Sequence, residues 1–334
     1  MGGSWSTVPA SEASQFLRTV WHCGWPGQQH PAINTAGHKQ EPTVQRRTQG
    51  WWNGLAGVVI FSGSLPATRL AVMAFDPVFL TGARAVIAAL LATGLLWAGR
   101  QRRPARQDLL PLAVVALGCV VAFPLFTALA LQHITSAHAM VFIGALPLAT
   151  AIFAVLRGGE RPRPAFWGVS ALGSSLIGGY ALAQGVAAAP VGDALMLAAV
   201  VACGLGYAEG ARLTARLGGW QVISWALVLA LPVMLPLAWL SAPATVAGVT
   251  APAWLGLAYV SVFSMLVGFV FWYRGLALGG VAAVAQLQLL QPFLGLMLAA
   301  LLLHEQVTWL MQVTALAVIG CVAGARRLAC ASPR

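Results

Sequence analysis

Polar side chains inside long apolar segments are the groups of this chain that could do chemistry. Arg84 lies about a third of the way into the apolar segment 78–99, where a charge costs roughly 2.5–3.5 kcal/mol on insertion scales. Such a cost favours one of two roles. Arg84 either faces a cavity and binds an anionic group, or it is a structural partner for a backbone carbonyl or for Asp76. The residues alone leave both alternatives open.

Glutamines lie beside a proline in the apolar segment 281–303. Gln288 and Gln291 are three residues apart and would share one face of a helix, whereas Gln286 would point elsewhere. Pro292 removes a backbone hydrogen bond and kinks the helix, which exposes carbonyl groups. Amides beside freed carbonyls suit a polar or zwitterionic solute. We therefore favour solute binding for Gln288 and Gln291 over hydrogen bonding between helices.

Tyr207 and Trp272 are further candidates for solute binding, because each aromatic ring lies in an apolar segment close to charged residues. The alternative is an aromatic anchor at the membrane interface, which we favour for the neighbouring Tyr273.

Two residues are candidates for a response to protons. Glu209 lies three residues before Arg212, which favours a local ion pair. Alternatively, it is a poorly solvated carboxylate that takes up a proton. His138 lies in the first turn of the apolar segment 136–156, and histidine titrates near neutral pH. A hydrogen-bonded histidine at the outer membrane interface is the favoured alternative.

The chain repeats a pattern at an offset of 145 residues, which aligns Pro147 with Pro292 and Glu160 with Glu305. Each proline lies within an apolar segment, where it would kink a helix. Each glutamate lies just before the next helix, and a carboxylate stabilises a helix N-terminus. We interpret both glutamates as structural.

Ten apolar segments of about 20 residues must position these side chains, and each could cross roughly 30 Å of hydrocarbon as a helix. They span residues 54–74, 78–99, 109–131, 136–156, 165–184, 192–213, 220–240, 253–273, 281–303 and 307–325. The sequence thus predicts an all-α integral membrane protein of about ten transmembrane helices.

Five helices per repeat is an odd number, so the second repeat enters the membrane inverted relative to the first. Inverted repeats are the architecture of many secondary transporters. The expected repeats are 54–184 and 192–328. Residues 1–50 lack helical periodicity and are expected to be a disordered cytoplasmic extension, unless the translation start is assigned too early.

Composition and charge support the membrane class. Of the 334 residues, 59% are hydrophobic and 8% are charged, against about 25% charged in soluble domains. The net charge of +11 comes from arginines clustered between apolar segments, not from a basic face, so we expect no nucleic-acid partner. Placing those arginines in the cytoplasm puts both termini inside.

Motifs for catalysis and for metal or cofactor binding are missing from the sequence. The five cysteines form no CxxC pair, and there is no HExxH, GxSxG or GxxxxGK[ST]. We expect no enzyme activity, no catalytic residue, no metal and no cofactor.

The two five-helix halves, the first-helix segment FSGSLPATRLA and the ending LLHEQVTWLMQVTALAVIGCVAGA resemble the drug/metabolite transporter superfamily in its ten-helix EamA-type branch. The resemblance covers about residues 54–328. It implies ten helices around a central cavity lined mainly by the first, third, fourth, sixth, eighth and ninth. It also implies glutamates after the fourth and ninth helices, where Glu160 and Glu305 stand.

The resemblance implies exporters of amino acids, metabolites or drugs. We therefore expect a secondary transporter that exports small polar metabolites, amino acids or drugs across the inner membrane by alternating access. A flippase for a lipid or lipid-linked substrate is the alternative, because it shares the implied fold. Expected partners are the solute and membrane lipids, and the protein is expected to be a monomer or a homodimer.

Overall fold

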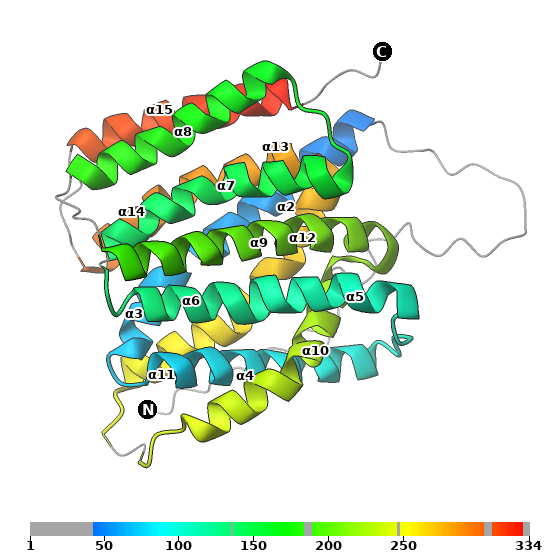
Figure 1. Cartoon of the computed structure of the whole chain (residues 1–334), viewed down its shortest axis with the longest axis vertical. Coiled ribbons are helices and arrows are strands. Elements are labelled where there is room, and N and C mark those ends of the chain that lie inside the picture. The colour runs from blue at the N-terminus through cyan, green and yellow to red at the C-terminus, as the bar shows by residue number, and fades with distance from the viewer. Residues whose placement is uncertain (1–42, 135, 184–188, 246–247, 304–308, 330–334) are drawn as a thin grey trace, which may run out of the picture. The chain divides into compact units, whose positions relative to one another are not determined.

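The computed structural model describes residues 43–134, 136–183, 189–245, 248–303 and 309–329, and every regular element in these ranges is a helix (Figure 1). The first half contains α2 (Thr43–Ser62), α3 (Ser64–Val72), α4 (Pro77–Ala98), α5 (Arg106–Val115), η1 (Ala116–Ala122), α6 (Phe123–Ala130), α7 (Ser136–Gly158) and α8 (Pro164–Ala183). The second half contains α9 (Pro190–Leu217), α10 (Gly219–Leu240), α11 (Ala251–Tyr259), η2 (Val260–Val267), α12 (Gly268–Gly279), α13 (Val281–Ala285), η3 (Gln286–Leu290), α14 (Gln291–Leu303) and α15 (Trp309–Leu328).

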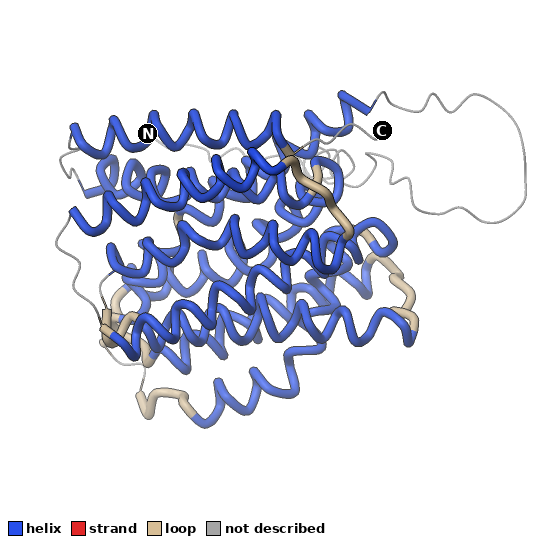
Figure 2. The backbone as a smooth tube through the Cα atoms, turned by 45° about the horizontal axis from the view of Figure 1, so that its top comes forward, coloured by secondary structure: helices blue, strands red, loops and turns tan. Residues whose placement is uncertain are grey.

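Consecutive elements continue one another, so the described residues form ten rods, five in each half (Figure 2). Within the described residues, six rods are long and apolar enough to cross a membrane by length and hydropathy; they span 45–72, 77–98, 106–130, 190–217, 219–240 and 251–279. Phe142–Gly158 and Val281–Gly295 are shorter apolar helices. The predicted all-α membrane fold of two five-helix repeats is confirmed.

The first rod begins earlier than the sequence predicted. Helix α2 starts at Thr43 rather than at residue 54, so residues 43–50 are helical and not part of a disordered extension. Hydropathy could not find this start, because polar residues such as Arg46 and Arg47 fill the first turns. Tertiary contact holds the segment, since Gly50 lies against the backbone of Gly279. Residues 1–42 lie outside the described ranges.

Equivalent helices of the two halves run antiparallel. A Cβ at Gly82, near the start of α4, would lie 2.7 Å from the amide nitrogen of Ala238, near the end of α10. In the α8–α15 pair, the Arg163 amide just before α8 donates to the carbonyl of Leu328, at the end of α15, at 3.3 Å. A helix and its repeat equivalent can pair in opposite directions only if the second half is inverted.

Glycines allow two of the rods to cross at backbone contact. A Cβ at Gly275 of α12 would lie 2.6 Å from the amide nitrogen of Gly54 and 3.0 Å from the carbonyl oxygen of Gly50, both in α2. Small residues at a crossing let helix backbones approach closely. The crossing joins the first rod of one half to the third rod of the other, and so it links the two halves.

The third rod of each half contains a π-helical turn at the same place. η1 begins at Ala116 and η2 begins at Val260, 144 residues later, close to the offset of the sequence repeat. A π-helical turn shifts the facing of the side chains that follow it, and such turns occur frequently at functional sites.

Gly275→Ala is expected to lower the melting temperature, because the added Cβ would meet backbone that cannot rotate away; overpacking of this kind costs about 1–3 kcal/mol. The melting temperature would be measured by tryptophan fluorescence of the purified protein in detergent. Gly94→Ala is the matched control, because a Cβ there meets nothing within 4 Å. We expect the control to melt at or above the wild-type temperature. Equal melting temperatures for the two variants would contradict the close crossing.

Candidate functional site

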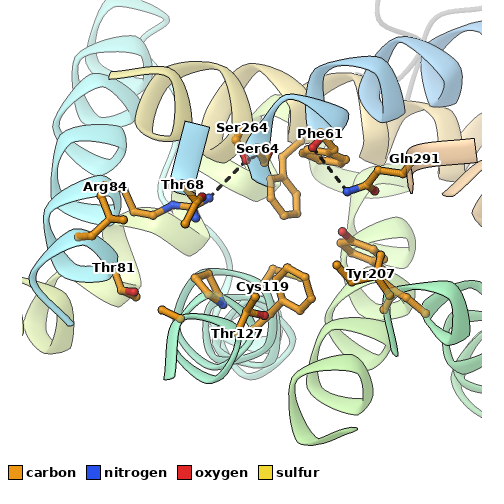
Figure 3. Close-up of a pocket in the computed structure, with 17 residues that line it drawn as sticks. Phe61, Ser64, Thr68, Thr81, Arg84, Cys119, Thr127, Tyr207, Ser264 and Gln291 are labelled. Atoms are coloured by element: carbon orange, nitrogen blue, oxygen red, sulfur yellow. Dashed lines mark hydrogen bonds between the residues drawn. The ribbon is translucent and has the colours of Figure 1, made fainter. Parts of the chain in front are cut away.

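A pocket of about 80 Å³ lies between the two halves, with walls from both (Figure 3). This volume holds several water molecules or a small solute group. Its polar lining residues are Ser64, Thr68, Thr81, Arg84, Thr127, Tyr207, Ser264 and Gln291. Aromatic rings of Phe61, Phe123 and Phe269 supply much of the apolar wall. The pocket therefore combines apolar surface with a few polar groups, as ligand sites do.

The pocket lies toward one end of the helix bundle. Helices α4, α7, α9 and α15 end within two residues of Arg100, Arg157, Arg216 and Arg327, and we call this the arginine-rich end. The lining residues of α3 and those in the first turns of α4 lie toward the opposite end. In Figure 1 the labels α5 and α3 mark the arginine-rich end and the opposite end.

Arg84, about two turns after the start of α4, reaches the pocket (Figure 3). One of its terminal nitrogens, NH2, donates to the hydroxyl oxygen of Ser264 at 3.3 Å. Its Nε is buried and has no hydrogen-bond partner among the described residues. Asp76 does not pair with it, because the Asp76 carboxylate caps α4 by accepting from the amides of Val78 and Phe79 at 2.8 and 3.1 Å.

Ser264 is a pocket residue that the sequence analysis missed. It lies in the π-helical turn η2, and its hydroxyl oxygen accepts from Ser64 at 2.8 Å as well as from Arg84. A serine inside an apolar segment is unremarkable in sequence. Its repeat equivalent, at 264 − 145, is Cys119, which also lines the pocket, but the sequence distinguished neither residue.

The two predicted glutamines point to the same region at different depths. Gln291 lines the pocket, with its amide nitrogen 3.5 Å from the carbonyl oxygen of Phe61. Gln288 is buried behind the wall and donates to the Tyr207 hydroxyl at 3.3 Å. Gln286 is fully buried, and its amide has no hydrogen-bond partner in the described part of the chain. Gln291 is therefore the only one of the three at the pocket surface.

The two prolines act differently on their helices. The turn before Pro292 is the 3₁₀ segment η3, in which the Gln291 amide donates to the Gln288 carbonyl. Proline lacks the amide that an α-helical turn needs at that point. By contrast, α7 continues as an α-helix through Pro147.

Trp272 is not a lining residue, contrary to the sequence expectation. Its side chain is fully buried, with ring centroids 5.4 Å from Tyr207 and 6.2 Å from Phe61. The crossing of α2 and α12 explains this position, because it places Trp272 against Gly57. Trp272 therefore supports two residues of the pocket wall from behind. Tyr207 does line the pocket, as expected.

Ion pairs join the two halves near the arginine-rich end. The Glu209 carboxylate, only 1% exposed, accepts from Arg157 of α7 at 2.5 Å and from Arg212 at 3.1 Å. The local pair with Arg212 was one of the sequence alternatives, whereas Arg157 is added by the fold. Asp108 of α5 pairs with Arg216 of α9. Both sets tie a helix of the first half to α9.

Glu160 caps a helix, although not the one that follows it in sequence. Its two carboxylate oxygens accept from the amides of Val281 and Ala282 at 2.7 and 2.9 Å, at the start of α13. Hydrogen bonds to the first amides of a helix favour a carboxylate there. Glu160 thus stabilises a helix N-terminus, as predicted, but the helix belongs to the ninth rod, so Glu160 links the fourth rod to the ninth. Glu305 and the side chain of His138 lie outside the described residues.

Within the described ranges, no group of three or more His, Cys, Asp or Glu side chains could hold a metal ion. Cys119, Cys203 and Cys321 are buried free thiols. The site is a pocket with one cation, hydroxyls, an amide and aromatic rings.

One family model matches both halves of this chain. The model of the EamA-like transporter family matches residues 48–181 and again residues 190–325. A relative from Bacillus subtilis (strain 168), named "Uncharacterized transporter YdeK", is 65% identical over 286 residues, which is 86% of this chain and 100% of that protein. A solved crystal structure aligns at a TM-score of 0.70 and 20% identity, covering 84% of this chain and 99% of that chain, which shows the fold alone.

Removing the arginines that hold Glu209 is expected to destabilise the protein more than replacing Glu209. The double variant Arg157→Ala/Arg212→Ala leaves a buried carboxylate without a cation, at a cost of about 3–5 kcal/mol. Glu209→Gln leaves two arginines that are about half exposed and can bind water. Melting temperatures in detergent would rank them, with Arg102→Ala/Arg103→Ala, both exposed, as the two-charge control. A lower melting temperature for Glu209→Gln would contradict this ranking.

Proposed function

Because the chain belongs to the EamA-like transporter family, we propose that it is a secondary transporter that exports a small polar solute by alternating access. The observation that carries the proposal is the polar pocket between two inverted halves. Binding sites of inverted-repeat transporters lie at the interface of the repeats. Rocking of the halves about such a site exposes it to one side of the membrane and then to the other.

The position of the pocket supports a conformation in which the arginine-rich end is closed. The pocket lies away from the arginine-rich end, where buried Tyr273 and the pairs Glu209–Arg157 and Asp108–Arg216 fill the interface. To open that end, the helices that these pairs join must separate. Glu209 and His138 remain the candidates for coupling to protons, Glu209 because its carboxylate is part of this closure.

We further propose that the arginine-rich end faces the cytoplasm of a cell whose inner membrane holds the protein. Arginines concentrate on cytoplasmic segments in membrane proteins, and this places both ends of the chain inside. The pocket then lies toward the outer face. Export is favoured over import by the resemblance to exporters.

Small polar metabolites, amino acids and drugs fit the pocket lining of hydroxyls, an amide and aromatic rings better than a lipid-linked substrate does. A flippase would need a lateral opening lined with arginines. Arg84 lies in the pocket, whereas most other arginines of the described part lie toward the arginine-rich end. We therefore favour a small soluble solute. We expect membrane lipids to contact the exposed apolar side chains. Either a monomer or a homodimer is compatible with this transport mechanism.

The function would be tested with the full-length protein in two steps. A screen of metabolites, amino acids, drugs and lipids would find compounds that raise the melting temperature, by about RT ln(1 + [L]/Kd) in free energy. Proteoliposomes would then be tested for transport of each compound that does so. We expect a stabilising small solute to be transported and Gln291→Ala to weaken both binding and transport. Stabilisation and movement of lipids alone would favour the flippase.

Alternating access predicts that the pocket is reached from the outer side in this conformation. With the five native cysteines replaced by alanine, Thr68→Cys is expected to react quickly with a membrane-impermeant thiol reagent added outside intact cells. Leu213→Cys, at the repeat-equivalent position (68 + 145), is buried and is the matched control for reagent added to inverted vesicles. We expect slow reaction there. Equal rates at both positions would contradict a closed arginine-rich end.

A further inference from the structure

Arg84 is a partly buried cation, with its Nε buried, and it has no acidic partner in the described structure. The chain has eight acidic residues, of which Glu12, Glu41 and Glu305 lie outside the described ranges. The remaining five are engaged elsewhere: Asp76, Asp108, Glu160, Asp193 and Glu209 bind helix or loop amides or arginines. A charge that is withdrawn from water without a counter-ion is unfavourable. A ligand anion would supply the missing partner.

The donors around Arg84 converge on the pocket (Figure 3). A guanidinium has five N–H donors, and among the described residues Arg84 donates to Ser264. The Ser264 oxygen already accepts from Ser64 and Arg84, which leaves its proton to donate. The Thr127 hydroxyl also lines the pocket and has no hydrogen-bond partner in the described part of the chain. These donors suit a carboxylate, which accepts through two oxygens.

The rest of the lining is uncharged. Gln291 and Tyr207 lie across the pocket from Arg84 in Figure 3, and Phe61 lies between Arg84 and this pair. No acidic side chain of the described residues lines the pocket. One carboxylate would therefore neutralise the site. The carboxylate of a zwitterionic amino acid would pair with Arg84, but its ammonium group would find no acidic side chain in the lining. A doubly charged phosphate would exceed the single cation.

We propose that the transported solute is a small monocarboxylate with an apolar body, whose carboxylate binds Arg84 together with Ser264 and Thr127. The aromatic wall receives the apolar body, and Gln291 contacts its far end. This assignment rests on the proposed transport function and narrows it. It distinguishes such acids from amino acids, cationic drugs and neutral polar metabolites.

The first test needs no knowledge of the solute. Without a ligand, Arg84→Gln removes an unmatched charge, so the variant is expected to melt at a higher temperature than the wild type, by about 3 °C or more. Arg102→Gln, on the exposed loop after α4, is the matched control and should not change the melting temperature. If Arg84 instead has a structural role, Arg84→Gln melts below the wild type, and the proposal is overturned.

The second test compares matched ligands on the full-length protein. Acetate, isobutyrate and phenylacetate would each be paired with the corresponding amide, and valine and phenylalanine would serve as the zwitterions. We expect at least one carboxylate to raise the wild-type melting temperature while its amide and the amino acids do not. Arg84→Gln should weaken that binding about 100-fold, and Arg84→Lys, which keeps the charge, should bind more tightly than Arg84→Gln. Equal effects of acid and amide, or carboxylate binding that survives Arg84→Gln, would overturn the proposal.

Transport measurements distinguish a failure of the monocarboxylate assignment from a failure of the proposed transport function. Proteoliposomes that move the stabilising carboxylate, and lose this transport in Arg84→Gln, support the monocarboxylate assignment. Transport of an amino acid or a cationic drug instead, with no carboxylate bound, rejects the assignment but keeps the transporter. Carboxylate binding without transport of any compound would retain the anion site and reject the proposed function.

Discussion

A polar group in hydrocarbon has no water to bind, so the protein itself must provide its partner. This constraint makes every rod of the described part helical, because a helix satisfies its own backbone. It also explains where the charges lie. Asp108, Glu209 and their arginines pair near one end of the bundle, whereas Arg84 is left with a serine hydroxyl. Arg84, a charged side chain without an acidic partner among the described residues, lines the pocket.

The two halves share a backbone plan but not the same polar residues. At an offset of 145 residues, Ser64 beside the pocket is equivalent to Glu209 in the ion cluster. A hydroxyl on one side and a paired carboxylate on the other give two ends of different character. The π-helical turns, by contrast, bring equivalent residues together, since Cys119 and Ser264 both line the pocket. A symmetric scaffold can thus hold an asymmetric site.

Buried residues behind the pocket position those at its surface. Tyr207 receives a hydrogen bond from Gln288 and an edge contact from Trp272, which restricts its ring. Glu160 ties the start of α13 to the end of α7, and α13 leads through η3 to Gln291. A side chain held in this way loses less conformational freedom when a solute binds.

The sequence alone determined the all-α membrane class, the ten rods and the repeat, and it singled out Arg84 as a candidate pocket residue. The cost of a polar group in hydrocarbon and the offset between Pro147 and Pro292 can both be read from the order of residues along the chain. The sequence also identified Tyr207 and Gln291, which line the pocket. Only the tertiary structure decided that Trp272 and Gln288 lie behind the wall and that Ser264 is Arg84's partner. These facts depend on helix rotation and on contacts between residues nearly 200 positions apart, and hydropathy contains no information on either.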